Sequence, residues 1–364
     1  MQAHGKWRSL VLALGPGLIT AAVVLGPGSI TVLSKTGATL GYKLLWVPLL
    51  AGILMGGYTV MAARIGIVAD APLLSLVRQH YGRVISALMG VAAFLVCCSF
   101  QAGDNMGVSV AIMSFVVEYL PNADPGMTIK IISALFTAVC IIVVAGAPNL
   151  YKTLERTMTI LVLVMIVCFI ANLLPAKPSA AGIVNGVIPH PAVRDLPLII
   201  PITATTFSVI AALYQGYIVR QKGWRLEDLG RGQFDAVLGI VVLGGLSIVI
   251  MITAAAVLHP HGITVQTAGD MGRQLEPLLG KTAKFFFAIG LWGASFSSQM
   301  ANPIIGGGLL ADGLGWGGRL DQPAVKWCTV AIMVIGAVVV QFFAGHMLNL
   351  IIFAQRITIV FVPL

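Results

Sequence analysis

The chain has 364 residues, of which 58% are hydrophobic and 10% are charged, and its mean hydropathy is +0.96. A soluble domain carries about 25% charged residues, because water must wet its surface. This composition excludes an ordinary soluble enzyme, a nucleic-acid-binding protein and a disordered chain. It predicts an integral membrane protein whose surroundings are the lipid bilayer.

Apolar runs long enough to cross a bilayer, which takes about 20 residues, recur along the whole chain. We therefore expect an all-α polytopic protein that forms a single transmembrane domain over residues 1–364, with no soluble domain and no required protein partner. The tenth run ends at Leu364 without a polar stop, so we expect the native chain to continue. The ten predicted spans are 10–40, 44–68, 84–118, 128–147, 155–175, 196–219, 235–258, 283–311, 325–344 and 347–364.

Basic residues indicate how these spans are oriented. The net charge is +9, and most of the 22 Lys and Arg residues fall in segments that share a side with the N-terminus. Cytoplasmic loops of membrane proteins carry an excess of Lys and Arg. We therefore expect a cytoplasmic N-terminus, in a bacterial inner membrane or a plasma membrane.

The first span carries the segment Gly26-Pro27-Gly28-Ser29 near the middle of the membrane. Proline removes a backbone donor, and the flanking glycines loosen the helix further. The segment is either a kink packed against a neighbour or an unwound break that faces a cavity, as in the substrate sites of secondary transporters. We expect the break, with Gly26, Pro27 and Ser29 at the substrate site, and with Gly26 and Ser29 offering oxygen to a metal ion.

The third span holds Gln101, Asp104 and Asn105 in a run that is otherwise apolar. A carboxylate at that depth is costly, so it must face a cavity or a partner. We expect these three residues to form a polar or coupling pathway, in which Asp104 acts through water and not as a direct ligand. The alternative is a structural ion pair with Arg356 or Lys326.

The sixth and eighth spans are also rich in polar side chains. Hydroxyl groups in spans often bond only to the preceding turn of their own helix, but the sixth span has four of them within six residues. The eighth span has a polar seam that includes Gln299 and is interrupted by glycines. We expect Thr205, Thr206, Ser208 and Gln299 to line the substrate site, and the glycines to allow close helix packing.

Several kinds of chemistry have no sequence signature here. The chain has no phosphate-binding Gly-Lys-Ser/Thr loop, no hydrolase elbow and no His-Glu-x-x-His zinc motif. We therefore expect neither an ATP-driven pump nor an enzyme, and no cofactor.

The motifs along the chain resemble those of the NRAMP divalent-metal transporters. The similarity rests on Gly15-Pro16-Gly17, the segment from Gly26 to Ser29, and the run Gly41-Tyr42-Lys43-Leu44-Leu45-Trp46-Val47, with weaker matches at 62–66, 288–298 and 355–363. The resemblance implies a LeuT-type bundle with two inverted five-helix repeats, at about 10–175 and 196–364, whose first and sixth helices are broken at a central site. It also implies an eleventh span beyond the present chain.

The sequence departs from that family at the metal ligands. Gly26 stands where the family has Asp, Ser29 stands where it has Asn, and the region Ser208-Val209-Ile210-Ala211 lacks the family's Met-Pro-His signature. The tenth-span glutamine of the family corresponds to Gln355, which we include among the substrate-binding residues. The remaining ligands are oxygen atoms, which suit hard ions better than soft ones.

Three functions are compatible with these features. The first is secondary-active transport, of NRAMP type, of a hard or hydrated divalent ion such as Mg2+, which releases its water reluctantly. The second is transport of a neutral or anionic small polar solute on the same fold, favoured by the lost carboxylate and by Arg356. The third is a sensor that changes state on binding without transport.

Overall fold

The computed structural model describes residues 15–119, 122–190, 195–265, 272 and 280–343. Every regular element in this part of the chain is a helix, in agreement with the predicted all-α class. The helices, in chain order, are α2 (Pro16–Val24), α3 (Pro27–Leu40), α4 (Trp46–Val68), α5 (Leu73–Tyr81), α6 (Arg83–Tyr119), α7 (Pro125–Gly146), α8 (Leu150–Ala176), α9 (Ala180–Val187), α10 (Leu196–Thr206), α11 (Val209–Lys222), the 3₁₀ turn η2 (Leu226–Asp228), α12 (Leu229–Val257), the 3₁₀ turn η3 (His259–His261), α14 (Lys281–Leu314) and α15 (Pro323–Phe343).

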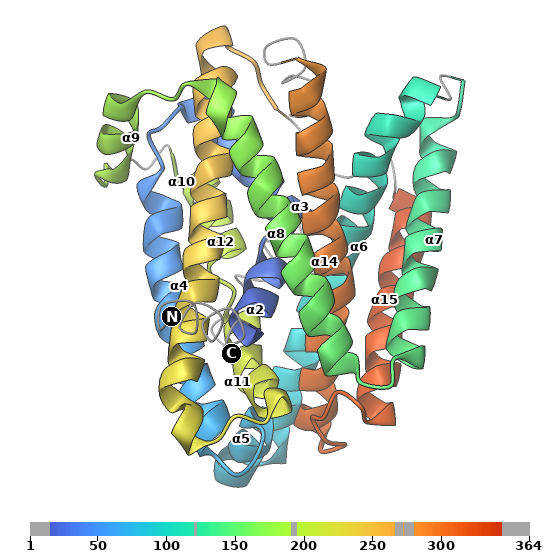
Figure 1. The fold of residues 1–364 in the computed structure, drawn as a ribbon. Helices are drawn as coiled ribbons and strands as arrows, with labels where there is room; N and C mark the ends of the chain where they lie inside the picture. The colour runs from blue at the N-terminus through green and yellow to red at the C-terminus, as the bar shows by residue number, and fades with distance from the viewer. Residues whose placement is uncertain (1–14, 120–121, 191–194, 266–271, 273–279, 344–364) are drawn as a thin grey trace, which may run out of the picture.

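Each of the first nine predicted spans corresponds to one helix or to one broken pair. By length and composition, seven helical segments of the described chain can cross a membrane, and eight can if the bent pair α2–α3 is one span. Helix α14 is not among them because it is more polar, yet its 34 residues run the full height of the bundle (Figure 1). The tenth predicted span, 347–364, lies outside the described residues, and so do Gln355 and Arg356.

The predicted interruption of the eighth span by glycine is wrong, because α14 is continuous from Lys281 to Leu314. Its glycines allow neighbouring helices to approach, as the sequence suggested. A Cβ atom on Gly306 would lie 2.6 Å from the Cβ of Cys97 on α6, and one on Gly307 would lie 2.5 Å from Oγ1 of Thr329 on α15. Larger residues at these two positions would push the helices apart.

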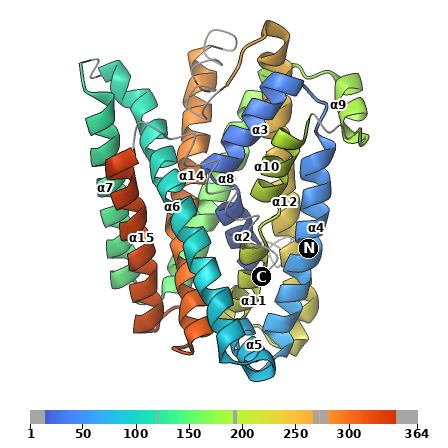
Figure 2. The same cartoon turned by 180° about the vertical axis from the view of Figure 1, so that it is seen from behind.

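The helices form one bundle around a shared apolar core. Helix α14 packs against α6, α8 and α15, while α12 packs against α2, α3 and α4. The two opposite views place α7 and α15 side by side at one edge of the bundle and α4 and α9 at the other (Figures 1 and 2). The broken helices α2–α3 and α10–α11 lie between these edges, so their breaks are shielded from lipid by protein.

Helix α12 fixes the position of α2 through a carboxylate and through close backbone contact at two glycines. The carboxylate of Asp235 accepts hydrogen bonds from the backbone N–H groups of Gly15 (2.9 Å) and Gly17 (2.6 Å). These groups lie at the start of α2, where backbone donors have no partner within the helix. A Cβ atom on Gly17 would lie 2.0 Å from the carbonyl oxygen of Asp235, and one on Gly239 would lie 2.1 Å from that of Gly17. The two backbones are therefore in contact, which fixes the position of the first break.

Candidate functional site

The first break is present where the sequence predicts it, but it is shorter than expected. Helix α2 ends at Val24, Leu25 has φ −82° and ψ 65°, and Gly26 is extended with φ −88° and ψ −178°. Pro27 then starts α3 at an angle of 59° to α2. Only Leu25 and Gly26 are non-helical, and the rest of the predicted segment forms the first turn of α3.

Hydroxyl groups donate hydrogen bonds to backbone carbonyls that the break leaves without a helical partner. The carbonyl of Val24 accepts a hydrogen bond from Ser29 Oγ (2.8 Å), and that of Val23 accepts one from Ser298 Oγ (2.8 Å). The carbonyl of Val24 also accepts a hydrogen bond from Gly26 N (2.9 Å), so both of its lone pairs are used. The carbonyl of Val23 keeps one lone pair for a further ligand.

The second break separates α10 from α11. Helix α10 ends at Thr206, Phe207 and Ser208 are extended, and α11 begins at Val209. Ser208 Oγ accepts a hydrogen bond from Ala211 N (3.4 Å), so Ser208 caps the second half-helix. Besides its bond to Val24, Ser29 Oγ makes a longer hydrogen bond to the carbonyl oxygen of Thr205 (3.3 Å). This bond joins the two breaks directly.

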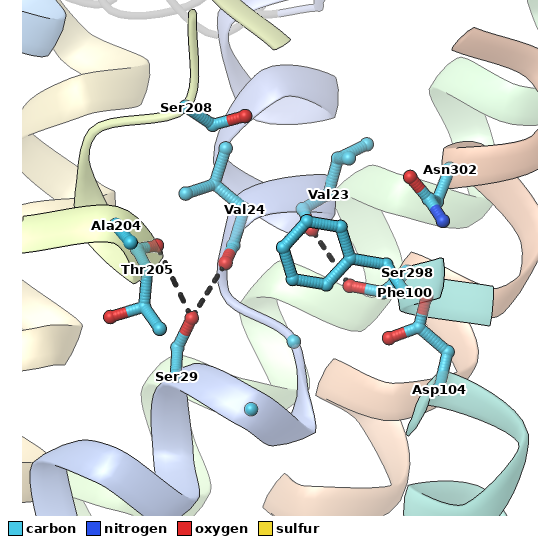
Figure 3. A pocket seen from close by; sticks show the side chains of 12 residues that line it. Val23, Val24, Ser29, Phe100, Asp104, Ala204, Thr205, Ser208, Ser298 and Asn302 are labelled. Carbon is cyan, nitrogen blue, oxygen red and sulfur yellow. Dashed lines mark hydrogen bonds between the residues drawn. The ribbon is translucent and has the colours of Figure 1, made fainter. Parts of the chain in front are cut away.

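A cavity of about 60 Å³ lies between the two breaks. Figure 3 shows its two walls: Ser29, Thr205 and Ser208 on the left, and Ser298, Asn302 and Asp104 on the right. The full lining consists of Val23, Val24, Gly26, Gly28, Ser29, Phe100, Asp104, Ala204, Thr205, Ser208, Ser298 and Asn302.

The lining includes five of the residues that the sequence singled out and leaves out the others. Gly26, Ser29, Thr205, Ser208 and Asp104 line the cavity. The remaining candidates among the described residues do not line it: Pro27, Gln101, Asn105, Thr206 and Gln299.

Asp104 is the main difference from the expected arrangement. We expected it to act at a distance from the broken helices, but Oδ1 of Asp104 lies 3.3 Å from the point where a Cβ atom on Gly26 would sit. The residue is 4% exposed, and its Oδ2 atom has no hydrogen-bond partner among the described residues. Lys326 is not its structural partner, since that side chain donates to the carbonyl of Ala145. The cavity therefore contains a carboxylate supplied by α6.

Gln101, Asn105 and Gln299 lie instead in a fully buried polar layer between α6, α7 and α14. Gln101 Nε2 donates to the carbonyl of Gln299 (3.1 Å), and Gln299 Nε2 contacts Oγ1 of Thr137 (3.4 Å). The side-chain oxygens of Gln101 and Gln299 and both amide atoms of Asn105 have no hydrogen-bond partner in the part of the chain that the structure describes. The expectation that Gln299 lines the cavity is therefore wrong for this structure.

Sequence reasoning missed Ser298, Asn302 and Phe100. Ser298 and Asn302 are four residues apart on α14 and so share one face of that helix. Phe100 precedes Asp104 by the same spacing on α6. This i, i+4 signal is present in the sequence, but it does not say which face of a helix meets the cavity.

Every polar group of this cavity is an oxygen donor or an amide. One carboxylate, four hydroxyls, one side-chain amide and the backbone carbonyls near the break surround the space, and no described residue adds sulfur or imidazole to the lining. Within the described part of the chain, no three His, Cys, Asp or Glu residues come together in a metal-binding cluster. The site can hold a hard cation through one charged ligand, neutral oxygens and water.

Residues 17–364 match the family described as Nramp, natural resistance-associated macrophage protein-like. The chain belongs to the Nramp family. The resemblance drawn from its motifs is thereby confirmed.

Curated relatives of this Nramp chain are similar over most of their length. The divalent metal cation transporter MntH of Bradyrhizobium diazoefficiens is 24% identical over 364 residues, which covers 96% of this chain and 78% of that protein. The protein of the same name from Chromohalobacter salexigens is 27% identical over 317 residues, covering 83% of this chain and 70% of that one.

Solved structures share the fold at lower sequence identity. The manganese transporter of Eremococcus coleocola, solved in complex with an aromatic bis-isothiourea substituted compound, superposes with a TM-score of 0.81 at 17% identity, covering 99% of this chain and 78% of that one. MhsT in complex with L-phenylalanine gives a TM-score of 0.54 at 16% identity, with 94% and 87% covered. The Nramp chain therefore has the predicted LeuT-type fold with two inverted repeats, the first helix of each being broken.

Proposed function

We propose that this Nramp protein is a secondary-active transporter of a hard divalent cation such as Mg2+, bound with part of its water shell. The relatives named above are divalent metal cation transporters and a manganese transporter, which supports a divalent cation as the substrate class. The observation that carries the choice of a hard ion is the cavity wall, which offers oxygen ligands and one carboxylate. Over residues 15–343, as far as the structure describes them, no soft thioether or imidazole ligand, of the kind that favours later transition metals, lines it.

The size of the cavity agrees with a partly hydrated ion. A water molecule needs about 10–15 Å³ of space of this kind, so the roughly 60 Å³ present accommodates an ion with a few waters. Mg2+ usually keeps several waters and binds through one or two carboxylates. Asp104 would supply the negative charge, while Ser29, Thr205 and Ser208 would bind the ion or its waters.

We also propose that the end of the bundle that carries α5 faces the cytoplasm, with the N-terminus on that side. Arg78 on α5, Arg220 at the end of α11 and Arg319 in the α14–α15 loop all lie at this end (Figure 1). Basic residues concentrate on the cytoplasmic side of membrane proteins. Labelling of a single cysteine introduced near Arg319 in spheroplasts and in inverted vesicles would test this orientation.

The central experiment is uptake into proteoliposomes from a panel of Mg2+, Mn2+, Ca2+ and neutral amino acids. We expect flux for Mg2+ above that of empty liposomes, and little discrimination in favour of Mn2+. Flux of an amino acid with background flux for every ion would instead establish the second candidate, a small-solute transporter.

A pair of variants at Ser208 tests the ligand argument directly. Ser208 lines the cavity at the second break. Replacing it by methionine adds a soft sulfur donor, so Ser208→Met should shift the preference from Mg2+ towards Mn2+ or Cd2+. Ser208→Leu has similar bulk without sulfur and serves as the matched control. An equal shift in both variants would mean that cavity shape, and not ligand softness, sets the selectivity.

A further inference from the structure

A second cavity, about 670 Å³ in volume, lies at the α5 end of the bundle, apart from the central site. Its walls come from the end of α4, the end of α11 with the residues that follow it, and the loop between α14 and α15. Small-molecule sites usually have volumes of about 300–1,000 Å³, so this cavity has room for an organic ion.

Of the described residues, three arginines and no acidic residue line this cavity. Arg220 is fixed, because its guanidinium donates to the backbone carbonyls of Gly66, Ala69 and Asp70 at the end of α4. Arg225 and Arg319 are exposed, and the described residues offer neither of them a carboxylate within ion-pair distance. The cavity wall therefore carries guanidinium groups that no carboxylate of the described residues pairs with directly.

Three acidic residues at this end of the bundle have other partners. Glu155 pairs with Lys222 (2.7 Å), and Asp228 pairs with Arg231 (3.4 Å). The buried carboxylate of Asp312 accepts hydrogen bonds from Ser75 Oγ, Ser75 N and Tyr217 OH. Three further acids, Asp70, Glu227 and Asp321, lie close in the chain to lining residues and are exposed, but among the described residues none of them forms an ion pair with an arginine of the cavity.

Guanidinium groups match the geometry of phosphate oxygens and bind them through two parallel hydrogen bonds. The side-chain amides of Gln221 and Gln322 also line the cavity and add neutral donors. A divalent cation would be repelled here. The chemistry of the lining therefore selects an anion, and above all one that carries phosphate.

The surroundings of the cavity indicate the source of such an anion. Trp316, in the loop before Arg319, is 58% exposed, and Trp327, in the first turns of α15, is 73% exposed. Exposed tryptophans gather where the lipid headgroups meet water. We propose that this cavity binds the phosphate of an anionic lipid headgroup, which ties the ends of α4 and α11 to the α14–α15 loop and stabilises this end of the bundle. A soluble phosphate compound has the same chemistry and is the other source to test.

The test measures the melting temperature of the full chain in two arms. In one arm the protein is in nanodiscs of phosphatidylcholine with or without phosphatidylglycerol; in the other it is in detergent and is titrated with inorganic pyrophosphate. Stabilisation by phosphatidylglycerol alone would identify a lipid, and stabilisation by pyrophosphate would extend the site to free anions. Higher salt should weaken both effects, since the arginines are accessible to water.

Variants identify the site within the chain. Arg225→Gln and Arg319→Gln should each raise the anion concentration needed for half-maximal stabilisation by about tenfold, as expected for a hydrogen bond to a charged group. Arg231→Gln is the matched control, because it removes the same charge at a position six residues after Arg225. The Arg231 side chain is 74% exposed and does not line the cavity. Arg225→Lys keeps the charge but lacks the parallel N–H donors of the guanidinium group, so it should retain part of the stabilisation by the anion. No stabilisation in either arm, or an equal loss in Arg231→Gln, would overturn the proposal.

Discussion

Replacing Gly26 by aspartate should create a two-carboxylate site and raise the affinity for divalent ions. Gly26 has φ −88° and ψ −178°, a conformation open to any residue. A Cβ atom there would lie 2.9 Å from Ser298 Oγ, which has to move by a small rotation, and 3.3 Å from Oδ1 of Asp104. The new carboxylate would therefore face the native one across the cavity.

The magnitude follows from the separation of the two charges. At roughly 4 Å, with an effective dielectric constant of about 20, two carboxylates repel each other by about 4 kcal/mol. A divalent ion between them removes this repulsion. Part of the gain is lost to desolvation, so we expect Gly26→Asp to bind Mg2+ or Mn2+ about ten- to a hundredfold more tightly, which is about 1.4–2.8 kcal/mol. Because protons compete with the ion for the carboxylates, the gain should increase with pH.

Calorimetry and melting temperatures measure this effect on the same preparation. Without divalent ions the two charges should lower the melting temperature of Gly26→Asp, and saturating Mg2+ should restore it, because a ligand that binds only the folded state stabilises it. Gly26→Asn has the same shape without the charge and is the control for steric effects. Equal Mg2+ affinity in a folded Gly26→Asp and in Gly26→Asn would refute the geometry on which this reasoning depends.

Three further substitutions test other parts of the structure. Asp104→Asn should weaken divalent-ion binding at least about tenfold, because it removes the charged ligand of the cavity, while the melting temperature stays the same or rises, because it removes a buried charge; calorimetry with Mg2+ measures the affinity. Gly239→Ala places a methyl group against the carbonyl of Gly17 and should destabilise the fold by about 1–3 kcal/mol in thermal unfolding. Tyr217→Phe removes the hydroxyl that donates to Asp312 (2.6 Å) and should cost about 1–3 kcal/mol, with faster hydrogen exchange at the start of α5.

Each of these three substitutions has a control in the same chain. Asp124→Asn changes an exposed acid far from the cavity and should leave Mg2+ binding unaltered. Gly245→Ala on the same helix meets no atom within 4 Å and should not destabilise. Tyr214→Phe removes a buried hydroxyl that has no partner within the described chain, and it should be neutral. The packing and hydrogen-bond arguments fail if a control has the same effect as its test variant.

The sequence by itself determined the class of the protein, the approximate positions of its first nine spans and the place of the first break. These properties depend on local chemistry: apolar runs about 20 residues long cross a bilayer, and proline after glycine removes a helical hydrogen bond within a few residues of itself. The break duly falls at Leu25 and Gly26. The oxygen character of the cavity followed in the same way, from the residue types near the two breaks.

Only the tertiary structure decided which polar side chains meet. Ser298 and Gln299 are neighbours on α14, but a step of one residue turns a helix by about 100°, so one faces the cavity and the other lies buried beside Gln101. Asp104 lies next to Gly26 because α6 packs against α3 near the first break. The rotation and height of each helix are set by contacts between residues far apart in the chain, such as Gly17 against Gly239, and packing of this kind leaves no local pattern in the sequence.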